Sequence, residues 1–214
     1  MLKTSAISTK NFFEKATKKV LVTEDRKKYL FKIAESIAKE YTTKSIVTLH
    51  YICTQNSRRS QLANVWSFFA AHHYKLNIIS TSGGNEVTCF NRSTIKTLQK
   101  AGFYFQLSDF SHQNPKYEIS FDGSKKILVG YSKLIDDASN PNPFIAITTC
   151  SEADKNCPYI PEASFRFHLP FEDPKRADGT LRQEEIYLEI SKQIAGEIGI
   201  IFNEVKNQLP FLEG

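Results

Sequence analysis

The sequence predicts an α/β protein built on a parallel sheet. Short apolar runs at 45–49, 76–81 and 144–149 have the length of buried strands. Stretches with helical spacing of apolar residues follow two of these runs, at 62–70 and at 91–101, and shorter strands near 103–105 and 165–168 continue the alternation. Strands that alternate with helices form parallel sheets with helices on both faces, and such sheets bind ligands at the carboxyl ends of their strands.

Residues 1–44 predict two helices that precede this alternation. Ser8 or Thr9 can cap the first helix, and Thr23, followed by two acidic residues, predicts the start of the second. The second helix carries an apolar stripe formed by Leu30, Ile33, Ala34, Ile37, Ala38 and Tyr41. We expect the pair to pack on its own domain and bury this stripe. The alternative is that the pair joins two copies of the chain as a homodimer.

Residues 45–214 form the second predicted unit, and its later part departs from the regular alternation. Apolar runs at 117–121 and 127–131 flank Asp122-Gly123-Ser124, which predicts a β-hairpin insertion, at about 116–135, along one edge of the sheet. Cys150 directly follows the run at 144–149, and Cys157 follows in a predicted polar loop. Thr180, with Gln183 three residues later, predicts a capping box for the closing helix.

Composition and charge exclude several classes of protein. With 214 residues, 41% apolar and 24% charged, the chain is typical of a globular protein with a sizeable core. A net charge of +5 with scattered lysines argues against nucleic-acid binding. No stretch approaches the ~20 apolar residues of a membrane span, and the first residues lack the apolar core of a secretory signal, so we expect a cytoplasmic protein. The histidines show no metal-ligand spacing, so neither a metal nor another cofactor is predicted.

The stretch between the first strand and the helix after it carries the chemistry. A helix N-terminus binds anions through its free N–H groups, and the planar fork of Arg59 suits two oxygens of one anion. The predicted oxyanion-binding residues are Thr54, Gln55, Asn56, Ser57, Arg58, Arg59 and Ser60. The same positive field favours the thiolate of Cys53, a candidate nucleophile to which Ser60 can donate a hydrogen bond. The alternative is a structural cysteine before surface arginines, but the strand before and the helix after favour the oxyanion site.

Three motifs resemble one superfamily. Cys53 to Gln61, together with Trp66, resembles the oxyanion loop of low-molecular-weight tyrosine phosphatases. The run from Thr149 to Pro158 resembles the redox cysteine pair of the thioredoxin-coupled arsenate reductases in that superfamily, and Asp173-Pro174 resembles its general acid. The resemblance spans about residues 45 to 206. It implies a four-stranded parallel sheet flanked by helices, to which residues 1–44 and the hairpin are additions.

The resemblance also implies a reaction. Cys53 attacks arsenate held by the loop and Arg59, while Asp173 protonates the departing oxygen. Cys150 and then Cys157 carry the oxidation outward to thioredoxin or a similar dithiol. The residues alone leave alternatives: Cys150 and Cys157 as incidental cysteines, and Asp173 as a turn residue before proline. Two other functions also remain open, a phosphatase acting on phosphotyrosine or small phosphoesters and a non-catalytic oxyanion-binding protein.

Three positions depart from the family pattern. Gln55 stands where the family has glycine, which implies strain if that position has a positive φ. Arg58 stands where relatives have cysteine or a small residue, and it either adds positive potential or points to solvent. Asn64 replaces an acidic residue that helps some of these reductases bind a structural potassium ion, so we do not predict that ion.

Overall fold

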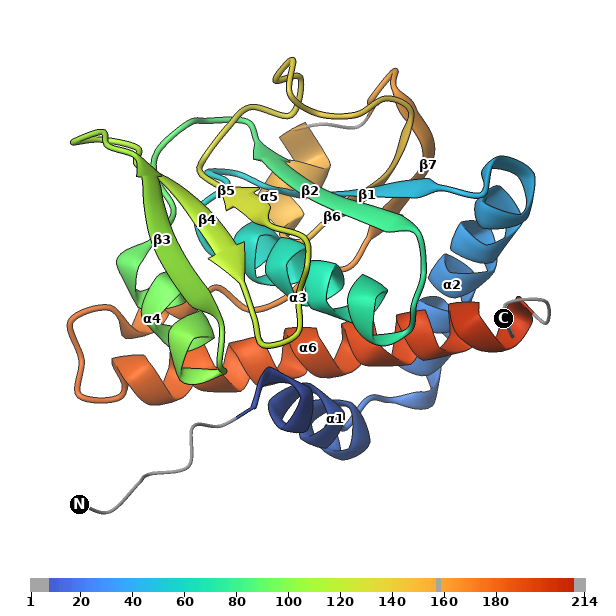
Figure 1. The fold of residues 1–214 in the computed structure, drawn as a ribbon, viewed down its shortest axis with the longest axis horizontal. Helices are drawn as coiled ribbons and strands as arrows, with labels where there is room; N and C mark the ends of the chain where they lie inside the picture. The colour runs from blue at the N-terminus through green and yellow to red at the C-terminus, as the bar shows by residue number, and fades with distance from the viewer. Residues whose placement is uncertain (1–7, 157–158, 210–214) are drawn as a thin grey trace.

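The computed structural model describes residues 8–156 and 159–209. Its centre is a four-stranded parallel sheet in the order β2-β1-β6-β7 (Figure 1), which confirms the predicted fold class. In chain order these strands are β1 (Val47–Cys53), β2 (Ile78–Gly84), β6 (Phe144–Thr148) and β7 (Ala163–His168). The helices are α1 (Thr9–Lys19), α2 (Glu24–Lys44), α3 (Arg59–His73), α4 (Arg92–Lys100), α5 (Ser151–Asn156) and α6 (Gln183–Gln208), with a 3-10 turn, η1 (Pro174–Ala177).

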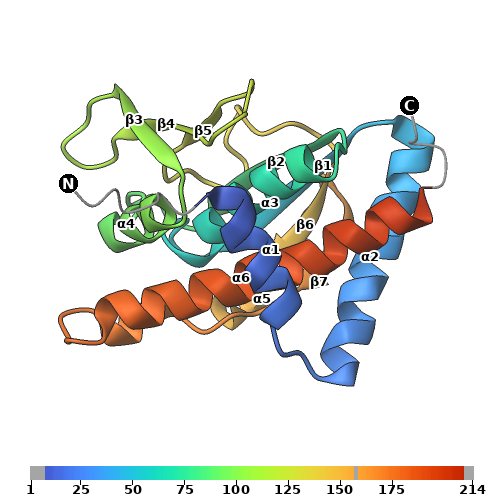
Figure 2. The same ribbon diagram turned by 60° about the horizontal axis from the view of Figure 1, so that its bottom comes forward.

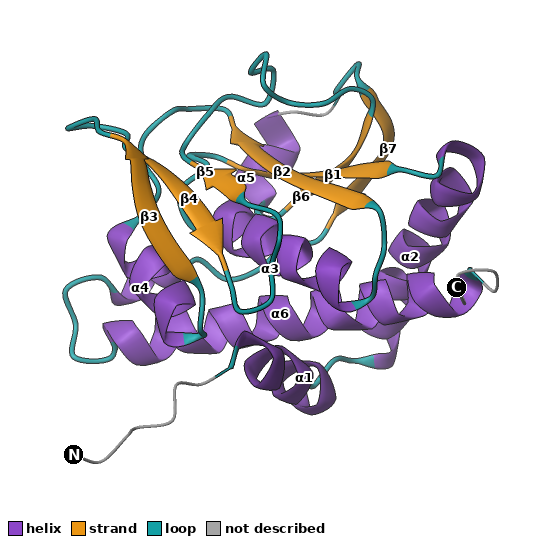
Figure 3. Ribbon diagram, in the orientation of Figure 1, coloured by secondary structure: helices purple, strands orange, loops and turns teal. Residues whose placement is uncertain are grey.

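The parallel sheet forms one side of the main hydrophobic core. The central strands β1 and β6 are buried along their whole length, as expected for strands inside a parallel sheet. Helices α3 and α6 lie together on one side of the sheet (Figure 3), and Trp66 of α3 is completely buried there. No helix in the described part of the chain has the length and apolar character needed to cross a bilayer.

The two N-terminal helices belong to this same core. Both lie against α6 (Figure 2), and the predicted stripe of α2 is buried from Leu30 to Ala38. Phe13 of α1 is completely buried beside Phe69, with ring centroids 5.1 Å apart. On α6, a Cβ added to Gly199 would lie 2.0 Å from Thr17 Oγ1, so glycine at this position permits the close approach of α1. The prediction that these helices pack on their own domain is confirmed.

The strand predicted near 103–105 does not join the parallel sheet. It forms β3 (Tyr104–Asp109), which pairs antiparallel with β4 (Lys116–Ser120), and β4 pairs with β5 (Leu128–Gly130). The hairpin prediction is therefore confirmed, but the hairpin belongs to a separate three-stranded sheet in the order β3-β4-β5. Most positions of β3 are exposed, whereas a strand of a helix-covered parallel sheet is buried on both faces.

Two local predictions were wrong. Helix α6 begins at Gln183 rather than just after Thr180, because the Thr180 hydroxyl donates to the Ala177 carbonyl and the Gln183 side chain accepts from the Gly179 N–H. The residues after Cys150 form α5 instead of a polar loop. The buried Ala153 faces the core from α5, and its N–H points at the sulfur of Cys150, 3.5 Å away.

Strand β1 carries a buried imidazole close to Cys53. His50 is completely buried, and neither of its ring nitrogens has a hydrogen-bond partner within the described residues. Its ring lies 4.7 Å from that of Phe144, and a Cβ on Gly83 would come within 2.7 Å of Nε2. Burial lowers the pKa of His50 to about 3, and the charge of Lys133 contributes in the same direction. The folded protein therefore holds this side chain neutral.

We expect Phe13→Ala to lower the free energy of unfolding by about 3–5 kcal/mol, because it leaves a cavity between α1 and α3. The measurement is urea unfolding followed by circular dichroism. Leu21→Ala is the matched control, since Leu21 is 96% exposed and should change stability by less than about 0.5 kcal/mol. Equal effects of the two substitutions would mean that α1 does not belong to the core.

His50 also predicts a pH dependence of stability. The unfolded chain binds a proton at this histidine near pH 6.5, whereas the folded chain does so only near pH 3. Above pH 6.5 the buried, neutral His50 therefore does not lower the free energy of unfolding. As the pH falls below 6.5, the unfolded chain binds a proton that the folded chain does not, and the free energy of unfolding decreases by about 1.4 kcal/mol per pH unit. Urea unfolding at pH 7 and pH 5 should show a loss about 2 kcal/mol larger in the wild type than in His50→Leu. Parallel pH profiles for the two proteins would contradict this account.

Candidate active site

The loop between β1 and α3 turns sharply at Asn56. This residue has a φ of +45° and is completely buried. Its side chain donates from Nδ2 to Ser60 Oγ at 2.9 Å and accepts at Oδ1 from the Lys133 N–H at 3.0 Å. Gln61 Nε2 donates to the Asn56 carbonyl at 3.1 Å. The loop is therefore held by buried side chains of its own sequence region and by the segment after β5.

Gln55 replaces the family glycine without backbone strain. In the described part of the chain the non-glycine residues with positive φ are Ser45, Asn56 and Lys75, so the left-handed residue of this loop is Asn56 and not Gln55. The Gln55 carbonyl accepts hydrogen bonds from the hydroxyls of Thr88 and Ser132. Gln55 does not have a positive φ, so it does not strain the loop.

Cys53 lies at the base of a pocket of ≈ 220 Å³. The sulfur of Cys53 is 3.0 Å from Ser60 Oγ, as the sequence predicted, and the residue is 4% exposed. The pocket is lined by Cys53, Thr54, Gln55, Ser57, Arg58, Arg59, Glu152, Asp173 and Lys175. Asn56 and Ser60 do not line it but lie buried behind the loop. Sequence reasoning missed Glu152 and Lys175, because neither belongs to a motif that would place it here.

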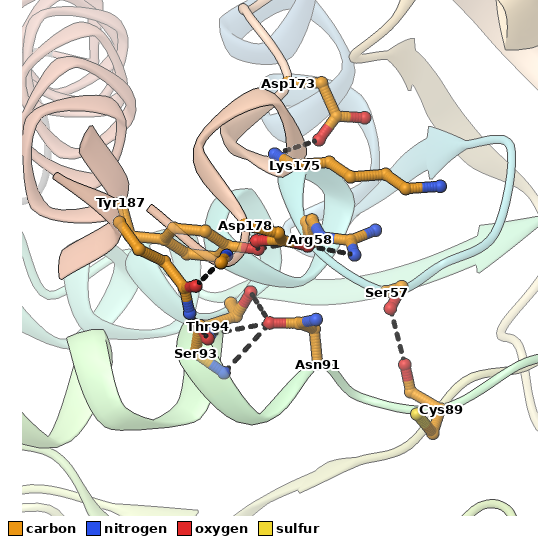
Figure 4. Close-up of polar contacts among 12 residues, drawn as sticks. Ser57, Arg58, Cys89, Asn91, Ser93, Thr94, Asp173, Lys175, Asp178 and Tyr187 are labelled. Carbon is orange, nitrogen blue, oxygen red and sulfur yellow. Dashed lines mark hydrogen bonds and ion pairs between the residues drawn. The ribbon is translucent and has the colours of Figure 1, made fainter. Parts of the chain in front are cut away.

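Arg59 joins the loop to the segment after β7. Its guanidinium donates to the Asp173 carboxylate at 2.6 Å and to the Phe171 carbonyl at 3.3 Å. The other Asp173 oxygen accepts from the Lys175 N–H at 3.0 Å (Figure 4). The Nε of Arg59 is buried and has no hydrogen-bond partner among the described residues. This N–H is therefore available to an anion that enters the pocket.

Arg58 does not point freely to solvent. It donates from Nε to the Tyr187 hydroxyl at 2.9 Å and forms an ion pair with Asp178 at 3.2 Å (Figure 4). Tyr187 in turn donates to Asp178 at 2.7 Å, and burial together with this bond raises the pKa of Tyr187 to about 12. Tyr187 and Asp178 were not predicted as site residues, because nothing local in the sequence connects Arg58 to a residue 129 positions away.

The remaining cysteines occupy different positions relative to the loop. Cys150 is 1% exposed at the end of β6, and its sulfur lies 3.6 Å from the hydroxyl of Thr54, the residue after Cys53. Cys157 lies outside the described residues. Cys89 is half-buried, and its carbonyl accepts from the Ser57 hydroxyl at 2.7 Å (Figure 4), so its backbone supports the loop. Within the described residues no His, Cys, Asp or Glu group is arranged as a metal site.

Comparison with known proteins identifies relatives of this chain. No family model matches the sequence. A Bacillus licheniformis protein named arsenate reductase is 29% identical over 150 residues, which cover 70% of this chain and 90% of that protein. Arsenate reductase 2 of Staphylococcus epidermidis is 30% identical over 128 residues, which cover 59% of this chain and 78% of the relative.

Solved structures show the same fold. The low-molecular-weight protein tyrosine phosphatase of T. tengcongensis matches with a TM-score of 0.52 and 14% identity, over 73% of this chain and 98% of that one. A low-molecular-weight protein tyrosine phosphatase from Bacillus subtilis matches with a TM-score of 0.50 and 13% identity, over 75% and 98% of the two chains. The chain therefore belongs to the arsenate reductases, and it has the fold of the low-molecular-weight protein tyrosine phosphatases.

Proposed function

We propose that the protein reduces arsenate to arsenite with Cys53 as the nucleophile. The observation that carries the proposal is the pocket, in which Cys53 lies with three cationic side chains, those of Arg58, Arg59 and Lys175. A tetrahedral oxyanion is the ligand that such a cationic cradle at a helix N-terminus suits. The names of the sequence relatives support arsenate as that oxyanion.

The first step forms a bond between sulfur and arsenic. The Cys53 thiolate attacks arsenic, and an As–O bond breaks while Asp173 donates a proton to the departing oxygen, which leaves as water. The loop N–H groups and the free Nε of Arg59 hold the other oxygens, and the contact of Arg59 with Asp173 keeps the acid beside them. In this step Ser60, at hydrogen-bond distance from Cys53, stabilises the thiolate.

The second step transfers electrons to arsenic. The Cys150 thiolate attacks the Cys53 sulfur, the electron pair of the S–As bond stays on arsenic, and arsenite leaves with a Cys53–Cys150 disulfide behind. Thr54 directly follows Cys53 in the sequence, and its hydroxyl lies beside the Cys150 sulfur. This proximity supports attack by Cys150 on Cys53. Two thiols are oxidised as arsenic gains two electrons.

The third step moves the disulfide from Cys53 to Cys157. Cys157 attacks Cys150 and frees Cys53, and thioredoxin or a similar dithiol then reduces the Cys150–Cys157 disulfide. Asp154 holds α5 to the sheet through Thr148 and Arg166. A relay of this kind operates in a reducing compartment, and we propose the cytoplasm.

The pocket favours an inorganic ion over phosphotyrosine. At ≈ 220 Å³ it is smaller than the roughly 300–1,000 Å³ of sites for drug-sized ligands. Among the described residues its lining contains no aromatic side chain against which a phenyl ring could stack. Phosphoester hydrolysis, which needs Cys53, Arg59 and Asp173 but neither later cysteine, is therefore the second candidate.

We expect Cys150→Ser to abolish arsenate turnover with thioredoxin while the hydrolysis of 4-nitrophenyl phosphate is unchanged, because only the relay uses this thiol. Cys89→Ser is the matched control and should retain both activities. Mass mapping of the wild type after one turnover without reductant should find a Cys150–Cys157 disulfide. Arsenate turnover in Cys150→Ser equal to that in Cys89→Ser would exclude the relay through Cys150, and robust phosphoester hydrolysis alongside it would favour the phosphatase.

We expect Asp173→Asn to lower the single-turnover rate of arsenate reduction by about 10²-fold or more, because the amide cannot donate an acidic proton. Rapid-quench measurement of arsenite, with phosphate affinity measured alongside by calorimetry, separates loss of the acid from loss of binding. A rate within twofold of the wild type would exclude Asp173 as the general acid.

A further inference from the structure

We infer that helix α2 of the N-terminal extension positions the proposed active site, with Arg26 and Tyr29 as the positioning residues. They act on the segment from His168 to Phe171, which leads from β7 to Asp173. The inference rests on the roles proposed above for Arg59 and Asp173. It gives the N-terminal extension a part in the reaction although none of its described residues, 8–44, lines the pocket.

One side of the segment is bonded to the end of the central sheet. The Leu169 N–H donates to the Thr148 carbonyl at 2.8 Å, and the Phe171 N–H donates to the Thr149 carbonyl at 3.1 Å. Pro170 lies between them and has no N–H to donate. The backbone at Pro170 can therefore be held only through its carbonyl.

Arg26 supplies that contact. Its guanidinium donates to the Pro170 carbonyl at 3.0 Å and lies 5.4 Å from the ring centroid of Phe171. Glu197 of α6 fixes the same fork, with its Oε2 3.0 Å from Nε and 2.8 Å from the amino group that also donates to Pro170. Glu197 is 1% exposed, so the pair is shielded from solvent and its geometry is tightly defined. Arg26 thus locks the segment to the long C-terminal helix.

Tyr29 makes a second contact from the same face of α2. Its hydroxyl accepts from the His168 N–H at 3.0 Å, and its ring meets that of Phe167 edge-on, with centroids 6.3 Å apart. Residues three apart on a helix lie on one face, so Arg26 and Tyr29 hold successive parts of the segment. Helix α2 therefore packs against the segment and holds it through these two contacts.

The position of the segment determines the positions of two residues that line the pocket, Arg59 and Asp173. The Phe171 carbonyl, one residue beyond the Arg26 contact, accepts from Arg59, and Asp173 follows two residues later with its own bond to Arg59. A displacement of Pro170 and Phe171 therefore changes the direction of the Arg59 guanidinium and the place of the acid together. Errors of about 1 Å at such positions are costly for catalysis.

The test uses two substitutions in the complete chain and a matched control. Tyr29→Phe removes one hydroxyl that accepts a backbone N–H. Tyr41→Phe, at the other end of α2, removes an equivalent hydroxyl that accepts from the Asn77 N–H at 3.0 Å. Arg26→Lys keeps a charge beside Glu197 but cannot bridge Glu197, Pro170 and Phe171 as a planar fork does.

We expect Tyr29→Phe and Arg26→Lys to weaken phosphate binding in calorimetry, and to lower kcat/KM for arsenate, by about three- to tenfold, the factor that one hydrogen bond represents. Tyr41→Phe should leave both unchanged, and thermal unfolding should report any general loss of structure. If Arg26→Lys does not fold, Tyr29→Phe decides alone. Equal phosphate affinity and kcat/KM in Tyr29→Phe and Tyr41→Phe would overturn the inference.

A double-mutant cycle distinguishes positioning from a general structural effect. In an Asp173→Asn background, the effect of Tyr29→Phe on phosphate affinity should shrink, because residues that act through one network are not additive. An effect of undiminished size would show that Tyr29 does not act through the segment. Phosphate affinity is measured without turnover, so it decides this inference even if the wild type reduces no arsenate and the proposed function fails.

Discussion

The arrangement of the site depends on the guanidinium of Arg59. One amino group is bonded to Asp173 and the other to the Phe171 carbonyl, so a residue at the start of α3 is joined to a segment more than a hundred positions later. The remaining Nε faces no partner in the described protein. A planar, delocalised cation can satisfy these three directions at once, which a lysine ammonium cannot do with the same geometry. The proposed anion site and the proposed acid are therefore held together by one side chain.

Buried hydrogen bonds within the protein also fix the shape of the oxyanion loop. Its turn is built on Asn56, whose side chain amide and carbonyl oxygen are both used inside the protein, and Gln61 closes the network beneath it. Buried polar networks of this kind specify one geometry because any alternative leaves a polar group unpaired. The loop thus has its shape before a ligand arrives, and little ordering is required on binding.

Much of this arrangement could be predicted from the sequence. The alternation of apolar runs and helical stripes located the strands of the parallel sheet, and the strand before Cys53 with the helix after it located the oxyanion loop. The contacts of Arg58 with Tyr187 and Asp178 could not be predicted, because Tyr187 reads as one more position on the buried side of a helix. Strand β3 was assigned to the wrong sheet because a run of three apolar residues does not specify its partner. Helix α5 was missed because its short polar sequence is stabilised by tertiary contacts of Ala153 and Asp154.

The packing of α1 and α2 on α6 has a consequence for biosynthesis. These helices leave the ribosome well before α6, which supplies part of the surface that covers them. The contacts of α1 and α2 with α6 span most of the described sequence, and such long-range contacts form late and slowly. The nascent protein therefore exposes two amphipathic helices until α6 has been synthesised. During that interval it is a substrate for chaperones and for aggregation.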